Sequence, residues 1–408
     1  MLRFLSSRET GEDNPILLQR AETTRRSYSL DLSRYRDVEQ VSHSSSVNCL
    51  DIDLVEDRYL LSGGSNGMIF VYDLYNGTKD VKYSCNIVAS VGLSNNDRHR
   101  CSIETVQWYP LDTGMFITSG TDRLLKIWDT NNLVVADHYE FKGIIYCHHL
   151  SSVAQQHSLI AVGYTGSSLK LIDMKSGSAT HSLRGHQKPV QCVQWSPKDE
   201  FILASGSTDG QVLLWDIRRA KGSLMKMDQF NGEGLSNSKD THVFAHDGHV
   251  NGLQFTTDGL LLVTLGTDQC IRLWSTASGR NTLVNYGKIN NMSRRCVKIS
   301  VSHNGSPDVI FIPEGSDINI YNIFSGSKID VLRGHYNQVN CCKFQRNYQE
   351  LYSGGNDRNI LIWVPNTDDA YEEHLRTISC QKRPQARTQS FNQKTALPTA
   401  DTWSSDED

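Results

Sequence analysis

Apolar residues occur along most of the chain in short alternating or continuous stretches, a pattern typical of β-strands. Residues 190–195 (VQCVQW) alternate apolar and polar side chains, as a half-buried strand does. Residues 201–205 form an apolar run, residues 206–210 (GSTDG) a turn cluster, and residues 212–215 a second apolar run. This part of the chain is therefore predicted to form three strands, followed by a short and variable fourth.

The same unit recurs seven times, and each copy of its third strand ends in Trp-Asp or a related pair. The aligned positions are Tyr72, Trp128, Ile172, Trp215, Trp274, Tyr321 and Trp363. The four shorter separations between these positions are 44, 43, 47 and 42 residues, close to the roughly 40–45 residues of one four-stranded propeller blade. The two longer separations contain loops around residues 75–101 and 219–245.

A His, a hydroxyl residue, an acid or amide, and an aromatic residue recur at constant spacing in five units. Buried together, these groups can hydrogen-bond in series, whereas each alone costs about a few kcal/mol to bury. We therefore predict a structural polar network whose members are His43, Ser62, Asn66; His99, Thr118, Asp122, Trp128; His186, Ser205, Asp209, Trp215; His246, Thr264, Asp268, Trp274; and His335, Ser353, Asp357, Trp363.

The third and sixth units depart from this pattern. They carry Gly166 and Gly315 in place of the acid and lack the His. We expect these two units to be held by apolar packing alone.

These repeats resemble the WD-repeat family, and the resemblance implies an all-β protein with a seven-bladed β-propeller over residues 36–364. In this family the segment before the first blade commonly supplies the outer strand of the last blade, which removes exposed sheet edges. Residues 36–41 are the expected segment. Residues 1–35 are expected to form a helix-loop-helix, and residues 365–408, which contain few apolar residues, a disordered tail with an acidic end.

Residues 15–26 read as a helix with Pro in its first turn. Its apolar side is formed by Ile16, Leu17, Leu18 and Ala21, and its basic side by Arg20, Arg25 and Arg26. Two interpretations stay open: the helix packs on its own propeller, or a helix-loop-helix inserts into another protein.

Composition narrows the possible functions. The chain has 41 Lys and Arg against 45 Asp and Glu, a net charge of −4, so direct DNA binding is not expected. The sequence contains no apolar run of about 20 residues, so no membrane span is predicted. The ten Cys are scattered without a Cys-x-x-Cys pair, which predicts reduced thiols in an intracellular protein. Neither a metal nor a cofactor is expected.

A hydrolase is one alternative, because the repeated His, Ser and Asp could serve as base, nucleophile and acid. An active site is needed once, whereas this set recurs, and no Gly-x-Ser-x-Gly, phosphate loop or His-Glu-x-x-His is present. Neighbours His148 and His149 face opposite sides of a strand, so joint metal ligation is not expected. We predict no catalytic residues and a role in protein recognition.

One unit carries a finer resemblance. Residues 202–218 (ILASGSTDGQVLLWDIR) are similar to the motif of substrate receptors of cullin-four RING ubiquitin ligases, marked here by Trp215, Asp216 and Arg218. Residues 103–116 (IETVQWYPLDTGMF) and 341–355 (CCKFQRNYQELYSGG) lie outside the repeat consensus. They resemble receptors of this class that act in transcription-coupled nucleotide excision repair.

The resemblance implies a nuclear, non-catalytic subunit that binds damage-specific DNA-binding protein one, the adaptor of a ligase with cullin four and a RING subunit. It also implies that stalled RNA polymerase II and the Cockayne syndrome B ATPase are presented for ubiquitination. On this basis we assign adaptor binding to Leu2, Phe4, Leu5, Leu17, Leu18, Arg20, Arg25, Arg26, Asp216, Arg218 and Arg219. A WD-repeat scaffold of another class, such as a histone-tail or signalling platform, stays the alternative.

Overall fold

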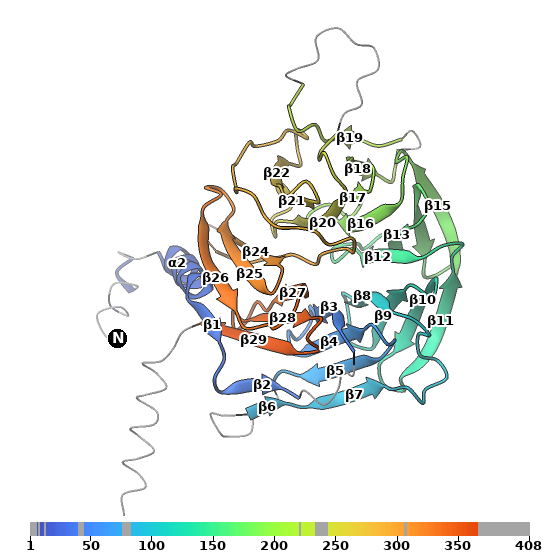
Figure 1. The fold of residues 1–408 in the computed structure, drawn as a ribbon, viewed down its shortest axis with the longest axis horizontal. Helices are drawn as coiled ribbons and strands as arrows, with labels where there is room; N and C mark the ends of the chain where they lie inside the picture. Colours follow the sequence, from blue (N-terminus) through green and yellow to red (C-terminus); the bar gives the residue numbers. More distant parts are fainter. Residues whose placement is uncertain are drawn as a thin grey trace, which may run out of the picture. The chain divides into compact units, whose positions relative to one another are not determined.

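Seven small antiparallel sheets are arranged in a ring (Figure 1), which confirms the predicted seven-bladed β-propeller. The structure is a computed structural model that describes residues 6, 9–11, 14–39, 45–75, 83–219, 222–232, 244–305 and 308–365. Residues 366–408, predicted to be a disordered tail, lie outside the described residues, as does most of the first half of the predicted helix-loop-helix.

The blades follow one another along the chain. Blade 1 contains β3 (Val47–Ile52), β4 (Tyr59–Gly64), β5 (Ile69–Asp73) and β7 (Ile87–Val91); blade 2 contains β8 (Ile103–Trp108), β9 (Met115–Gly120), β10 (Leu124–Asp129) and β11 (Val134–Glu140). Blade 3 contains β12 (Ile145–Leu150), β13 (Leu159–Tyr164), β14 (Ser168–Asp173) and β15 (Ser178–Arg184); blade 4 contains β16 (Val190–Trp195), β17 (Ile202–Ser207), β18 (Val212–Asp216) and β19 (Met225–Lys226).

The remaining blades are less uniform. Blade 5 has three strands, β20 (Val250–Phe255), β21 (Leu261–Gly266) and β22 (Ile271–Ser275). Blade 6 contains β23 (Ser300–Val301), β24 (Val309–Glu314), β25 (Asp317–Asn322) and β26 (Lys328–Arg333). Blade 7 contains β27 (Val339–Phe344), β28 (Leu351–Gly355), β29 (Ile360–Pro365) and β1 (Leu30–Leu32).

Strands near the centre are buried more completely than their sequences indicate. The alternating residues of β16 predict one buried face, yet Gln191 is buried together with the apolar positions. The reason is that each blade packs between two neighbours, so both faces of its inner strands are covered. Outer strands such as β15 are mostly exposed.

The outer strand of the last blade is formed earlier in the chain than predicted. β1 pairs antiparallel with β29, with Leu30 opposite Pro365, and Leu30 is buried in the core between blades 6 and 7. The expected segment 36–41 has another role, because β2 (Arg36–Val38) pairs parallel with β6 (Tyr83–Cys85). The propeller therefore begins at Leu30, inside the segment 1–35 that was predicted to be separate from it.

Blade 6 is not held by apolar packing alone, contrary to expectation. The side chain of Asn319 is buried and donates hydrogen bonds to the Glu314 carboxylate and, at 3.5 Å, to the Tyr321 hydroxyl. Glu314 also accepts a backbone N–H from Asn290 at 2.6 Å. This blade thus has its own polar network, built from residues that the repeat pattern does not include.

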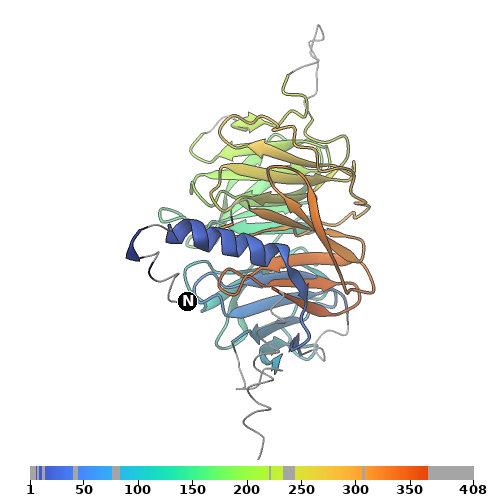
Figure 2. The same ribbon diagram turned by 90° about the vertical axis from the view of Figure 1, so that its left-hand side faces the viewer.

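The predicted helix is present as α2 (Pro15–Tyr28). The Asn14 side chain accepts the backbone N–H of Ile16 at 3.0 Å, which caps the first turn, and Pro15 occupies a position where no donor is needed. Figure 2 shows the N-terminal end of α2 pointing away from the strands.

Candidate protein-binding face

The ends of the strands define two faces of the propeller. The first and third strands of a blade run in the same direction, because both are antiparallel to the second. The turn after β16 and the residues after β18 therefore share one face. Arg20 of α2 lines a cavity whose mouth is also lined by residues that follow first strands, such as Leu54 and Pro197. We call this side the α2 face.

The second half of α2 attaches the helix to the propeller. The Gln349 amide donates to the Thr23 hydroxyl at 3.0 Å, and the Asn322 amide donates to the Tyr28 hydroxyl at 3.1 Å. Thr23 and Ser27 are the buried residues of the helix. These contacts join α2 to the turns of blades 6 and 7.

The predicted apolar side of α2 does not pack on the propeller. Ile16, Leu17 and Leu18 are 58%, 60% and 37% exposed. The helix packs on the propeller with Thr23 and Ser27, so its apolar side chains face solvent. A group of exposed apolar side chains indicates a surface that can bind another molecule. Leu2, Phe4 and Leu5, assigned to the same surface, lie outside the described residues.

The basic residues of α2 have different environments. Glu22 accepts hydrogen bonds from Arg25 at 2.8 Å and from Arg26 at 2.9 Å, and these bonds lower the pKa of Glu22 to about 2. Arg25 and Arg26 are therefore held beside an acid on the helix surface. Arg20 is exposed and lines the cavity instead.

Arg218 is positioned by Asp216. Its Nε and Nη2 atoms each donate to one Asp216 carboxylate oxygen at 2.9 Å, and its guanidinium lies 4.5 Å from the centre of the Phe201 ring. Asp216 is buried, whereas the Arg218 side chain remains 56% exposed. Asp216 therefore holds the Arg218 guanidinium in place, and Arg218 is exposed on the α2 face. The Nε atom of Arg219 lies 4.0 Å from the same carboxylate.

Several exposed apolar side chains on the α2 face are not predicted by the repeat pattern. Val55, Leu111, Leu260 and Tyr348 lie in turns after the first strands of four blades, and Phe324 follows the third strand of blade 6. Their signal in the sequence was an apolar residue inside a turn cluster, which has no role in the strand pattern.

The repeated polar network lies at the opposite face and has the same geometry in blades 2, 4, 5 and 7. The His Nδ1 is 2.8, 3.3, 2.9 and 2.8 Å from the Asp carboxylate, and the His Nε2 is 2.7 Å from the hydroxyl. The Trp Nε1 donates to that hydroxyl at 2.8 or 2.9 Å. Each indole proton, hydroxyl proton and Nδ1 proton therefore has an acceptor when the His is neutral.

Burial favours that neutral form. It lowers the pKa of His99, His246 and His335, although the partner Asp opposes this effect in each pair. In blade 1, the Asn66 side chain accepts the backbone N–H of Met68 at 3.1 Å, and Ser62 is buried; His43 lies outside the described residues.

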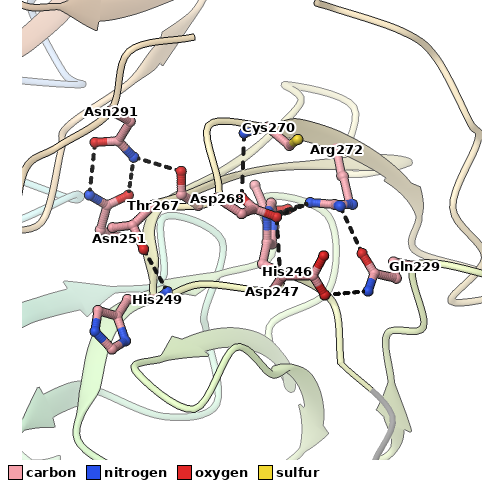
Figure 3. Close-up of polar contacts among 12 residues, drawn as sticks. Gln229, His246, Asp247, His249, Asn251, Thr267, Asp268, Cys270, Arg272 and Asn291 are labelled. Atoms are coloured by element: carbon pink, nitrogen blue, oxygen red, sulfur yellow. Dashed lines mark hydrogen bonds and ion pairs between the residues drawn. The ribbon is translucent and has the colours of Figure 1, made fainter. Parts of the chain in front are cut away.

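Blade 5 extends its network with three further residues (Figure 3). Arg272 donates to Asp268 and to the Gln229 side chain, both at 2.7 Å, and Gln229 donates to Asp247 at 2.8 Å. Burial raises the pKa of Asp268, but His246 and Arg272 outweigh burial and hold it below its ordinary value. This cluster is a structural ion-pair network rather than an acid–base site.

The part of the chain that the structure describes contains no metal-ligand cluster and no membrane-spanning helix. No group of three or more His, Cys, Asp and Glu there could hold a metal ion. His148 Nδ1 lies 2.7 Å from the Ser119 hydroxyl, and His149 Nδ1 accepts the backbone N–H of Trp195 at 3.2 Å. Within the same residues, no helix is long and apolar enough to cross a membrane.

Comparison with known proteins agrees with this architecture. The WD domain, G-beta repeat family matches residues 37–73, 177–216, 238–275 and 326–364, which include third strands of blades 1, 4, 5 and 7. The chain is 33% identical to the WD repeat-containing protein ATCSA-1 of Arabidopsis thaliana, across 90% of this chain and 95% of that protein. It is 25% identical to Radiation-sensitive protein 28 of Saccharomyces cerevisiae, across 43% of this chain and 38% of that protein.

Proposed function

This chain belongs to the WD-repeat family that includes the Arabidopsis protein ATCSA-1, and we propose that it is a substrate receptor of the Cockayne syndrome A type in a cullin-four RING ubiquitin ligase. In this proposal it acts in the nucleus, in transcription-coupled nucleotide excision repair. It bridges damage-specific DNA-binding protein one to stalled RNA polymerase II and the Cockayne syndrome B ATPase.

One observation carries the proposal: α2 exposes Leu17 and Leu18 on the face that also presents Arg218. Apolar side chains at the centre of an interface usually contribute most of its affinity, and Arg is the charged residue most often found beside them. The adaptor is therefore proposed to bind the α2 face, and substrates the opposite face.

The proposed role is proximity rather than chemistry. WD-repeat propellers typically serve as non-catalytic scaffolds. A receptor that holds a substrate near an activated ubiquitin raises the effective concentration of the acceptor lysine, and the recruited conjugating enzyme performs the transfer.

The test is the affinity of the purified full chain for the adaptor. The double substitution Leu17→Asp and Leu18→Asp places two charges on the exposed side of α2, and we expect it to weaken binding at least about tenfold. The control replaces two equally exposed residues on outer strands, Val88→Asp and Val134→Asp, and is expected to bind normally. Biolayer interferometry measures both, and equal affinities for the two variants contradict the assignment.

Arg218→Ala probes the second part of the surface. It leaves the Asp216 carboxylate without its two strongest donors, so thermal unfolding must be measured beside the affinity. Weaker adaptor binding at unchanged melting temperature supports a contact. An affinity purification that returns histones without adaptor and cullin favours the scaffold alternative.

A further inference from the structure

A cavity of about 720 Å³ extends from the α2 face into the centre of the propeller. Phe324, which is 63% exposed, lies at its mouth. Its inner end is lined by Cys49, Cys147, Cys192, Cys296 and Lys298. Four thiols and one ammonium group thus lie around a space that is open to solvent on one side.

The segment 291–298, which connects blades 5 and 6, covers the other end of this space. The Gln191 side chain of blade 4 donates to the backbone carbonyl of Arg294 at 3.0 Å. The Arg295 side chain donates to Asn48 of blade 1 at 3.1 Å. Because these contacts reach separate blades around the ring, the segment crosses the central axis, and entry from the α2 face is the route that the cavity offers.

Lys298 holds its ammonium group at the inner end of the cavity. Its Nζ donates to the Thr105 hydroxyl at 2.9 Å and to Cys147 Sγ at 3.3 Å. Within the described residues, no carboxylate forms an ion pair with this Nζ at 4.0 Å or less. The Lys298 side chain is half-buried and lines the cavity, and its charge also acts on the buried Glu104 carboxylate. A positive charge in direct contact with the Cys147 sulfur favours the negatively charged form of that sulfur.

We propose that Cys147 is a reactive thiolate paired with Lys298, and that it is a modification site for small uncharged oxidants and electrophiles that enter the cavity from the α2 face. With hydrogen peroxide, the sulfur attacks one oxygen and the O–O bond breaks. The sulfur is oxidised by two electrons and keeps this oxygen with its proton as a sulfenic acid, while the other oxygen leaves as hydroxide, which the buffer protonates to water.

The surroundings distinguish Cys147 from the other thiols. A hydrogen bond from the Cys296 thiol and the adjacent Lys298 charge outweigh burial and hold the pKa of Cys147 well below its ordinary value. Burial instead raises the pKa of Cys192 and of Cys49 well above that value. The carbonyls nearest to Cys147 Sγ are 3.6 and 3.7 Å away, farther than Nζ. Since the thiolate is the nucleophile, modification is expected at Cys147 before the others.

The experiment labels the native full chain with a limiting amount of iodoacetamide at neutral pH and measures each Cys peptide by mass spectrometry. Cys147 is expected to react at least about tenfold faster than Cys192. Lys298→Met is expected to lower the rate at Cys147 by a similar factor and to leave the exposed Cys101 unchanged. Equal rates at Cys147 and Cys192, or an unchanged rate at Cys147 in Lys298→Met, overturn the proposal.

Two further experiments control for unfolding and test whether reagents reach Cys147 through the cavity. Thr105→Val removes the other acceptor of Lys298 but keeps the Lys–Cys pair, so Cys147 should stay reactive. A maleimide carrying a long polyethylene glycol chain should label Cys101 and spare Cys147, because the cavity admits only small reagents. Labelling of Cys147 by this large reagent in the folded wild-type chain contradicts entry through the cavity. With peroxide and dimedone, the sulfenic acid adduct is expected at Cys147.

Discussion

The Ser205 hydroxyl holds two other buried groups in place. It accepts the Trp215 indole N–H at 2.8 Å and lies 2.7 Å from His186 Nε2, to which it donates when the His is neutral. A buried donor or acceptor that loses its partner costs about 1–3 kcal/mol. The hydroxyl therefore stabilises blade 4 through both neighbours at once.

We expect Ser205→Ala to lower the free energy of unfolding by about 2–4 kcal/mol, because both the indole N–H and the imidazole nitrogen lose a partner without gaining solvent. Urea denaturation followed by tryptophan fluorescence measures the change. Ser182→Ala on the exposed strand β15 is the matched control and should stay close to wild type. A Ser205→Ala variant as stable as this control would show that the network contributes little.

At the scale of single residues, the sequence predicted side-chain contacts wherever the spacing of residues repeats from blade to blade. The His, hydroxyl, Asp and Trp positions come from a constant register within one blade, so their contacts could be predicted together. The bonds from Arg272 to Gln229 and from Lys298 to Cys147 join residues from different blades or loops. No spacing in the sequence relates such pairs, because the ring brings them together.

β1 and α2 are neighbouring elements with different roles. β1 completes blade 7, and Leu30 is buried there, whereas the first turns of α2 stand in solvent. A strand of three residues within a polar stretch gives almost no periodic signal. Its position is set by the unpaired edge of β29, which only the closed ring presents.

Deleting residues 1–34 should therefore destabilise the propeller as well as remove α2, since the edge of β29 and the core around Leu30 become exposed. Differential scanning fluorimetry should give a melting temperature lower by at least about 4 °C, the shift expected in a propeller of this size from the loss of roughly 3 kcal/mol or more. The Leu17→Asp, Leu18→Asp variant keeps β1 and should melt as wild type. Equal melting temperatures for the deletion and wild type would contradict the role of β1.

Closure of the whole ring depends on glycine at the contact between blades 7 and 1. A Cβ atom at Gly354 would lie 2.6 Å from Val47 Cγ1 and 3.0 Å from Val47 Cβ. Gly206 faces Val250 of the next blade, and Gly63 faces Ile103, with similarly short distances. The same position in the second strand thus sets how closely neighbouring blades approach.

Gly354→Ala is expected to push blade 7 away from blade 1 and lower the free energy of unfolding by about 1–3 kcal/mol. Urea denaturation measures the loss. Gly92→Ala is the control, because its Cβ would meet no atom within 4 Å and the residue has no positive φ. If both variants unfold at the same urea concentration, the interface between blades 7 and 1 has room for the added methyl group.

The sequence by itself determined the number of blades, the three inner strands of each and the members of the repeated network in blades 2, 4, 5 and 7. These features are local, because they depend on hydrophobic periodicity and fixed spacing over about 40 residues. Only the tertiary structure decided which segment closes the ring, which side of α2 stays exposed, and which thiol meets Lys298. Each of these depends on contacts between residues far apart in the chain, which the closed ring brings together.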